Sequence, residues 1–216
     1  MNEKIYEDLM QSYVRKKHLI KARLNEFREV WRSGDDRRIF EEFVFCVFTA
    51  GASARMGLRS LECIRDILME ASSEELASRL RHVHRFPNAR ASYIVTTREY
   101  FRREFGFRLR ELISSFRDPL ERRDFFALNK NIKGIGYTQA SHFLRNIGFF
   151  GYAILDKHIV RSLYEFGVIE SPRPPSTRKR YLEVERRFKE FALEVGISPD
   201  ELDLLLWSEK TGHIPR

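Results

Sequence analysis

The chain has 216 residues, 43% of them hydrophobic, which is enough for one sizeable core or two small helical lobes. Lysine and arginine outnumber aspartate and glutamate by 39 to 31, and the resulting net charge of +8 either serves solubility or favours a polyanionic partner such as nucleic acid. No apolar run approaches the roughly twenty residues that span a bilayer, and the N-terminus is too charged for a secretory signal. We therefore expect a soluble, intracellular protein.

The two cysteines, Cys46 and Cys63, lie in helical stretches and have no CxxC or Cys/His spacing around them. This pattern excludes the usual zinc and iron–sulfur sites, so no catalytic metal is expected. Both side chains are expected to be free thiols in a reducing compartment.

The first helix with a clear pattern covers residues 35–49, where apolar side chains recur at steps of three and four. This spacing predicts an amphipathic helix. Ser53 then stands where an N-cap belongs, and the helix that it starts is predicted to run to about Met69.

Residues 131–141, NIKGIGYTQAS, place Gly134 and Gly136 between two helices. Glycines at this spacing let the backbone turn tightly and bring the free N–H groups of the next helix close to a phosphate. Ile132 and Ile135 are expected to anchor the turn in the core. Because tight turns also use glycine for steric reasons alone, the segment by itself leaves both a phosphate site and a plain turn open.

Asp156 lies among apolar residues in AILDKHI, at the predicted start of a helix that ends near Gly167. An aspartate at this position is commonly a cap that the helix dipole stabilises. Its carboxylate can also oppose the positive charge that develops on a sugar as a base departs. On these residues alone, capping is the favoured interpretation.

The C-terminal part continues with helical spacing. Residues 171–175 form a proline-rich connector or hinge, and residues 178–195 form a second amphipathic pattern. Ser198-Pro199-Asp200-Glu201 is typical of a capping box with proline at the first helical position. Since no stretch alternates as a strand would, the sequence predicts an all-α fold.

Residues 133–163, KGIGYTQASHFLRNIGFFGYAILDKHIVRSL, resemble the helix-hairpin-helix signature of the base-excision DNA glycosylase superfamily. The tract ASHFLRN followed by AILDKHI is similar, more narrowly, to the type-2 8-oxoguanine DNA glycosylase/AP lyases, found mainly in archaea and some thermophilic bacteria. The similarity extends to residues 43–50, to RFPNARASYIV at residues 85–95 and to the C-terminal LDLLLWSEKTGHIPR. It therefore covers most of the chain.

The resemblance implies a two-lobed helix-hairpin-helix glycosylase fold with a cleft between the lobes, formed by residues 1–216 as one unit. Roughly residues 50–165, including the hairpin at 131–148, would form a central lobe. Residues 1–49 and 166–216 would together form the second lobe. No hydrophobic seam argues for an oligomer, so we expect a monomer.

The resemblance further implies an enzyme that flips a damaged base, in the first place 8-oxoguanine, out of duplex DNA and cuts its glycosidic bond with the help of Asp156. Phe86 and Trp207 match the aromatic residues that hold the base, although without the family each would be assigned to the core. Arg216 ends the chain nine residues after Trp207. There the family tends to end in a lysine whose terminal carboxylate contacts N7 of 8-oxoguanine, so this chain keeps the carboxylate and changes the side chain.

The lysine that forms a Schiff base in the family corresponds to Thr138 here, which we keep among the site residues. Threonine has no amine, so the imine that leads to strand cleavage cannot form there, and its hydroxyl can instead satisfy backbone groups. Water can act as the nucleophile with Asp156; Lys130, Lys133 or Lys157 can take over; or the change, natural or engineered, has left a lesion binder without catalysis. We favour the first, a monofunctional glycosylase.

Duplex DNA with a damaged base is the expected partner. The hairpin residues expected to contact it are Lys133, Gly134, Ile135 and Gly136. Residues 178–180 are either further phosphate contacts or the solvated face of a helix. The resemblance implies that backbone carbonyls near Lys130, Ile132 and Ile135 hold a monovalent cation that bridges to phosphate, and no other cofactor is expected.

Three rival functions remain. The first is a glycosylase for uracil, hypoxanthine or an alkylated purine, the second a non-catalytic DNA-lesion binder, and the third a general hairpin module within a larger repair assembly. Asp156 with the aromatic pair favours catalysis, whereas Thr138 favours the binder. A protein of any of these kinds is expected to be cytoplasmic and nucleoid-associated, without membrane contact.

Overall fold

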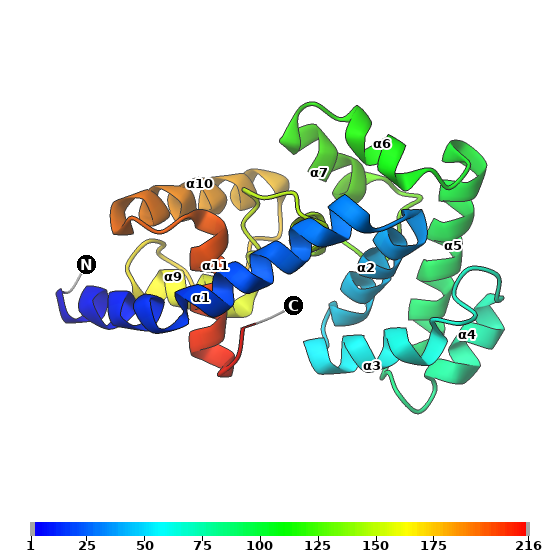
Figure 1. Ribbon diagram of the computed structural model, residues 1–216, viewed down its shortest axis with the longest axis horizontal. Coiled ribbons are helices and arrows are strands. Elements are labelled where there is room, and N and C mark those ends of the chain that lie inside the picture. Colours follow the sequence, from blue (N-terminus) through cyan, green and yellow to red (C-terminus); the bar gives the residue numbers. More distant parts are fainter. Residues whose placement is uncertain (1–2, 215–216) are drawn as a thin grey trace. The chain divides into compact units, whose positions relative to one another are not determined.

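The computed structural model describes residues 3–214, which form eleven helices and no strand (Figure 1). The all-α prediction is confirmed. The helices are α1 (Glu3–Ser33), α2 (Asp36–Thr49), α3 (Ala54–Ile64), α4 (Ser73–Leu80), α5 (Pro87–Phe105), α6 (Leu109–Ser115), α7 (Pro119–Leu128), α8 (Tyr137–Asn146), α9 (Lys157–Glu165), α10 (Arg178–Val195) and α11 (Pro199–Thr211).

The chain divides into two compact units, which we call the split unit, Met1–Arg28 with Gly148–Arg216, and the continuous unit, Glu29–Ile147. These borders differ from those at residues 50 and 165 that the sequence analysis gave. α2 belongs to the continuous unit because it contacts α3, α5, α6 and α8, and α9 belongs to the split unit because it packs on α11. Helical periodicity shows that a face is apolar but not which helix covers it.

α2 is the buried centre of the continuous unit. Its N-cap, Asp35, accepts a hydrogen bond from the backbone N–H of Arg38 at 2.7 Å. Every residue from Ile39 to Phe48 is buried. The prediction of an amphipathic helix with one solvent-exposed face is therefore wrong. Neighbouring helices cover all of its sides, and even Glu42 in this run is 1% exposed and paired with Arg38 at 2.7 Å.

Phenylalanine rings fill the core beside α2 and fix α8 in place. The ring of Phe143 lies 5.7 Å from Phe43 and 5.0 Å from Phe126, measured between ring centroids, and Phe101 lies 6.0 Å from Phe43. All of these contacts are edge-to-face, the arrangement that aromatic quadrupoles favour. The helix that follows the glycine turn is therefore anchored by its apolar face.

The end of α3 differs from the prediction. Ser53 caps the helix as expected and accepts from the backbone N–H of Met56 at 3.2 Å, but the helix ends at Ile64 instead of near Met69. The backbone carbonyls of Leu68 and Met69 accept hydrogen bonds from arginines of α5. Since these carbonyls are bound by another element, the chain turns before it could continue as a helix.

The helix ends predicted from glycines and capping residues in the C-terminal part agree with the structure. Gly167 and Gly196, with φ of 73° and 68°, follow α9 and α10 where the sequence predicts their ends. Ser198 caps α11 by accepting from the backbone N–H of Glu201 at 3.4 Å. The second half of the predicted capping box is replaced, because the Glu201 carboxylate accepts from the hydroxyls of Ser198 and Tyr13 at 2.8 and 3.1 Å.

We predict that Phe143→Ala lowers the free energy of unfolding by about 3–5 kcal/mol, because the cavity left among the rings cannot close fully. Urea denaturation followed by circular dichroism measures this. Leu193→Ala is the control, since this side chain is 84% exposed and its removal should change stability by less than about 0.5 kcal/mol. Equal effects of the two substitutions would contradict the anchoring of α8 by its aromatic contact.

Candidate active site

Asp156 is the N-cap of α9. Its backbone is extended, with φ −79° and ψ 179°, and its Oδ1 accepts hydrogen bonds from the backbone N–H groups of His158 at 2.8 Å and Ile159 at 2.9 Å. The capping role predicted from the sequence is confirmed. Capping occupies only one oxygen of the carboxylate.

The second carboxylate oxygen of Asp156, Oδ2, contacts another predicted site residue of the split unit. Trp207 of α11 donates its indole Nε1–H to Asp156 Oδ2 at 3.0 Å. A carboxylate offers about four lone-pair positions, two on each oxygen. The two backbone donors use those of Oδ1 and the indole uses one on Oδ2, so one position on Oδ2 is left for a further donor.

The backbone before Asp156 is held by buried side chains of α10 and α11. The N–H of Ala153 donates to Glu185 at 2.8 Å, and that of Ile154 donates to Asp203 at 3.1 Å. Tyr181 accepts from the N–H of Leu155 at 3.2 Å and donates to the carbonyl of Ala153 at 2.6 Å. These bonds fix the extended segment that carries Asp156.

These three supporting side chains are not among the site residues predicted from the sequence. Tyr181 and Glu185 are four residues apart on the buried face of α10, and Asp203 is buried in α11. A carboxylate on the apolar face of an amphipathic helix is the signal that could have found them, because a buried charge requires partners.

Trp207 is not a core residue, since it is only partly buried. The rings of His158 and His213 lie edge-on to its indole, at centroid distances of 5.7 and 5.2 Å. The expectation that Trp207 belongs to a site is therefore compatible with its surroundings. Arg216, the third predicted base-binding residue, lies outside the described residues.

In the continuous unit, Gly134 and Gly136 form the turn before α8 but serve different purposes. Gly134 has φ 82°, and a Cβ on it would lie 2.8 Å from the ring of Tyr93, so the fold itself requires glycine there. Gly136 has φ −121°, and a Cβ on it would meet nothing within 4 Å. Its missing side chain leaves open space above the start of α8.

Side chains of α5 form hydrogen bonds with this turn and with the residues just before it. The backbone N–H of Lys133 donates to Thr97 Oγ1 at 2.9 Å, and Asn129 Nδ2 donates to the hydroxyl of Tyr100 at 2.8 Å. Of the two predicted anchors, Ile132 is 4% exposed and confirms the expectation. Ile135 is only partly buried, because the turn carries it toward the surface and α5 supplies the anchoring instead.

Thr138 is the second residue of α8 and is partly buried. Within residues 3–214 its hydroxyl has no hydrogen-bond partner, so the predicted satisfaction of backbone groups is not seen. Lys130, Lys133 and Lys157 are exposed, and none forms an ion pair with another residue in that part of the chain.

Phe86 is the N-cap residue of α5 and is 42% exposed, so it too is no core residue. Its backbone N–H donates to His84 Nδ1 at 3.0 Å, while His84 Nε2 contacts the carbonyl of Phe48 at 3.0 Å. Burial lowers the pKa of His84, which suits the neutral ring that accepts at Nδ1. The guanidinium carbons of Arg85 and Arg90 lie 4.6 and 5.7 Å from the centre of the Phe86 ring.

The predicted residues thus form two groups. Asp156 and Trp207 meet in the split unit, whereas Phe86, Thr138 and the hairpin belong to the continuous unit. The described residues contain no group of three histidine, cysteine or acidic side chains that could hold a metal ion, and neither Cys46 nor Cys63 forms a disulfide there. Each helix within residues 3–214 is either too short or too polar to span a bilayer.

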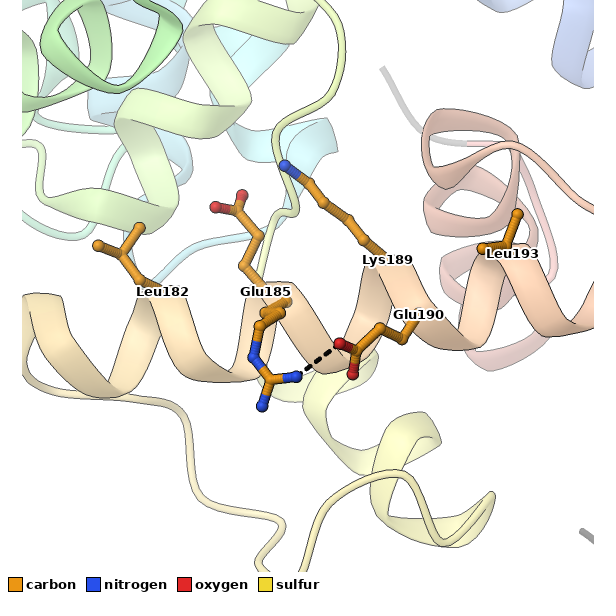
Figure 2. A pocket seen from close by; sticks show the side chains of 6 residues that line it. Leu182, Glu185, Lys189, Glu190 and Leu193 are labelled. Atoms are coloured by element: carbon orange, nitrogen blue, oxygen red, sulfur yellow. Dashed lines mark hydrogen bonds and ion pairs between the residues drawn. The ribbon is translucent and has the colours of Figure 1, made fainter.

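A separate hollow of about 440 Å³ lies along α10 (Figure 2). Its lining residues are Leu182, Glu185, Arg186, Lys189, Glu190 and Leu193. An Arg186–Glu190 ion pair at 2.5 Å runs along the helix. None of the predicted site residues lines this hollow, and only Glu185 connects it to the segment that carries Asp156.

Known proteins match the chain over almost its whole length. The family described as 8-oxoguanine DNA glycosylase matches residues 20–197. The 8-oxoguanine DNA glycosylase/AP lyase of Korarchaeum cryptofilum is 41% identical over 214 residues, 96% of this chain and 98% of that protein. The chain belongs to the 8-oxoguanine DNA glycosylase family.

Solved structures of this family agree with the fold. The 8-oxoguanine DNA glycosylase of Thermotoga maritima is 36% identical, with a TM-score of 0.87 and 99% of each chain covered. The Methanocaldococcus jannaschii 8-oxoguanine glycosylase/lyase, in complex with a 15mer DNA containing 8-oxoguanine, is 34% identical, with a TM-score of 0.88 and 98% of this chain and 99% of that chain covered. The helix-hairpin-helix fold expected from the sequence is confirmed.

The ASHFLRN tract, which carried much of the resemblance to 8-oxoguanine DNA glycosylases, is largely structural. Ser141, Arg145 and Asn146 are buried. Arg123 donates to the Ser141 hydroxyl at 3.3 Å, and Asn146 donates to the buried carboxylate of Glu42 at 3.3 Å. The tract therefore ties α8 to α2 and α7, which keeps the start of α8 in place.

We predict that Asp156 and Trp207 stabilise each other, which a double-mutant cycle of Asp156→Asn and Trp207→Phe measures in urea unfolding. The asparagine can still cap α9 through its oxygen, but its amide then meets the indole N–H donor to donor. The coupling energy should be about 1.5–3 kcal/mol, the net value of a hydrogen bond to a charged group. Additive effects would show that the bond is absent in solution.

Proposed function

We propose that this chain is a DNA glycosylase that removes 8-oxoguanine from duplex DNA and leaves the abasic strand uncut. The observation that carries the proposal is the Asp156 carboxylate, fixed by two backbone donors and an indole with one lone-pair position of Oδ2 left over. The names of the relatives in K. cryptofilum and M. jannaschii, 8-oxoguanine DNA glycosylase/AP lyase, support the substrate, as does the lesion-containing DNA in the M. jannaschii structure.

Base removal by water breaks the bond between C1′ of the sugar and the base nitrogen. Positive charge develops on the sugar, and the negative charge of Asp156 opposes it. The water oxygen bonds to C1′, and the water proton passes to Oδ2. The electron pair of the broken bond leaves with the base, which takes up a proton and is released as free 8-oxoguanine. The fixed position of the carboxylate means that little reorganisation is needed.

The strand-cleaving step requires a primary amine, which Thr138 lacks. Lys133 is exposed and its backbone is tied to α5 by the bond to Thr97, whereas Lys157 directly follows the cap. Neither is held toward the sugar by a contact within the described residues. Covalent catalysis depends on a positioned nucleophile, so we propose that neither lysine replaces the missing one.

The hairpin is proposed to bind a phosphate of the DNA backbone. The open space above Gly136 lets a phosphate approach the free N–H groups at the start of α8, and Lys133 adds an exposed charge. The carbonyls of Lys130, Ile132 and Ile135 accept no hydrogen bond from a backbone N–H among residues 3–214. They are therefore suited to hold the monovalent cation that the family resemblance implies.

Thr138 also supports a second candidate, a protein that binds the lesion without excising it. In that case Asp156 serves only as a cap and as a partner of Trp207, both of which it does in this structure. Base release distinguishes the two candidates, because binding alone frees no base.

We predict that the parent protein releases 8-oxoguanine from a lesion-bearing duplex and that Asp156→Asn abolishes release, while DNA affinity is retained because the fold keeps its cap. Mass spectrometry of the freed base measures this. Asp118→Asn is the matched control, since Asp118 caps α7 in the same way and is exposed. No release of any oxidised, deaminated or alkylated base by the parent would favour the lesion binder.

We predict that Thr138→Lys gains strand cleavage and is trapped on the DNA by borohydride, whereas the parent protein leaves an abasic strand that breaks only in hot alkali. The added amine provides the group that forms the imine. Gln139→Lys is the control, because it adds the same amine one residue along α8. If the parent is itself trapped by borohydride, one of its own lysines performs the lyase step and the monofunctional assignment is wrong.

A further inference from the structure

We infer that Arg90 binds a backbone phosphate of the DNA, at a site separate from the turn of the hairpin. The inference rests on the proposed function, because the anion is part of the DNA duplex. It concerns a residue that the sequence analysis did not select.

Arg90 belongs to a row of side chains on α5, which we call the α5 stripe. Its members are Phe86, Arg90, Tyr93, Thr97 and Tyr100. They recur at alternating steps of four and three and so share one face of the helix. The last three contact the hairpin or the residues just before it, through the ring of Tyr93 against Gly134 and the hydrogen bonds of Thr97 and Tyr100. Arg90 therefore stands between the hairpin and the exposed Phe86.

The charge of Arg90 lacks a counter-charge in the described part of the chain. The partly buried Arg38 has one in Glu42 at 2.7 Å, and the buried Arg98 has one in Glu99 at 2.9 Å. Arg90 instead donates to the carbonyl of Ala50, and its buried Nε has no hydrogen-bond partner. Burial lowers the pKa of this guanidinium, which reflects the cost of keeping it charged there.

Two aromatic rings lie close to the guanidinium. Its central carbon lies 5.7 Å from the centre of the Phe86 ring and 5.8 Å from that of Tyr93. A guanidinium has five N–H donors, and the bond to Ala50 uses one. The remaining Nη donors form a preorganised fork that matches two oxygens of a phosphate. A phosphate would also supply the missing counter-charge.

A purely structural role of Arg90 predicts a different result. If the residue only closes the C-terminal end of α2 through Ala50, its removal lowers stability and leaves the interaction with DNA unchanged. The salt dependence of binding separates the two roles, because removing one phosphate contact reduces the slope of log K against log salt by about 0.9.

The test uses the full chain and a short undamaged duplex, with affinity measured by fluorescence anisotropy across a potassium chloride series. Arg90→Met should reduce the slope by about 0.9 and weaken binding about tenfold at moderate salt. Arg90→Lys should keep the slope, because it keeps the charge. Arg103→Met, which removes an exposed arginine of the same helix outside the α5 stripe, should behave as the parent does.

An unchanged slope in a folded Arg90→Met variant overturns the inference. If that variant does not fold, modification of the parent by phenylglyoxal decides: Arg90 should be protected by the duplex and Arg103 should not. Equal modification of Arg90 with and without DNA overturns the inference as well. A parent protein that shows no salt-dependent affinity for the duplex contradicts the proposed function itself, which is a different failure.

Discussion

The Asp156 carboxylate accepts hydrogen bonds both from the backbone of α9 and from the indole of α11. This double contact links the two helices within the split unit. Oδ1 starts α9 and Oδ2 receives the indole of Trp207 from α11. Both bonds require the backbone before Asp156 to stay extended, which Tyr181, Glu185 and Asp203 ensure from the other side. The same atom group therefore serves stability and the proposed chemistry, so the fold fixes the carboxylate before any DNA arrives.

The continuous unit follows a comparable principle with a different element. A single face of α5 sets the position of the hairpin, because Tyr93 packs under Gly134 and Thr97 binds the backbone of Lys133. The two glycines have different roles. Gly134 is required because a Cβ there would collide with the ring of Tyr93, whereas Gly136 leaves room for a ligand. Phe86 lies on the same helix face, so the aromatic residue and the turn are held in a constant relation by rigid helical geometry.

The proposal that Thr138 permits base release without strand cleavage treats these as two chemically distinct steps. Opposing the charge on the sugar depends on a carboxylate, and cutting the strand depends on an imine. The chain keeps the turn that carries the position, with α8 anchored through Phe143 and Asn146. The proposed absence of the lyase step rests on one side chain, so it is compatible with the family assignment.

The sequence by itself determined the helical class, the caps at Ser53, Asp156 and Ser198, and the glycine turn, because periodicity, capping and turn chemistry act within a few residues. Only the tertiary structure decided that α2 is buried on all sides and that Ile135 reaches the surface. It also decided that the indole of α11 meets a carboxylate distant in sequence. Such contacts depend on which faces pack together, and a pattern of apolar spacing carries no information about the partner of a face.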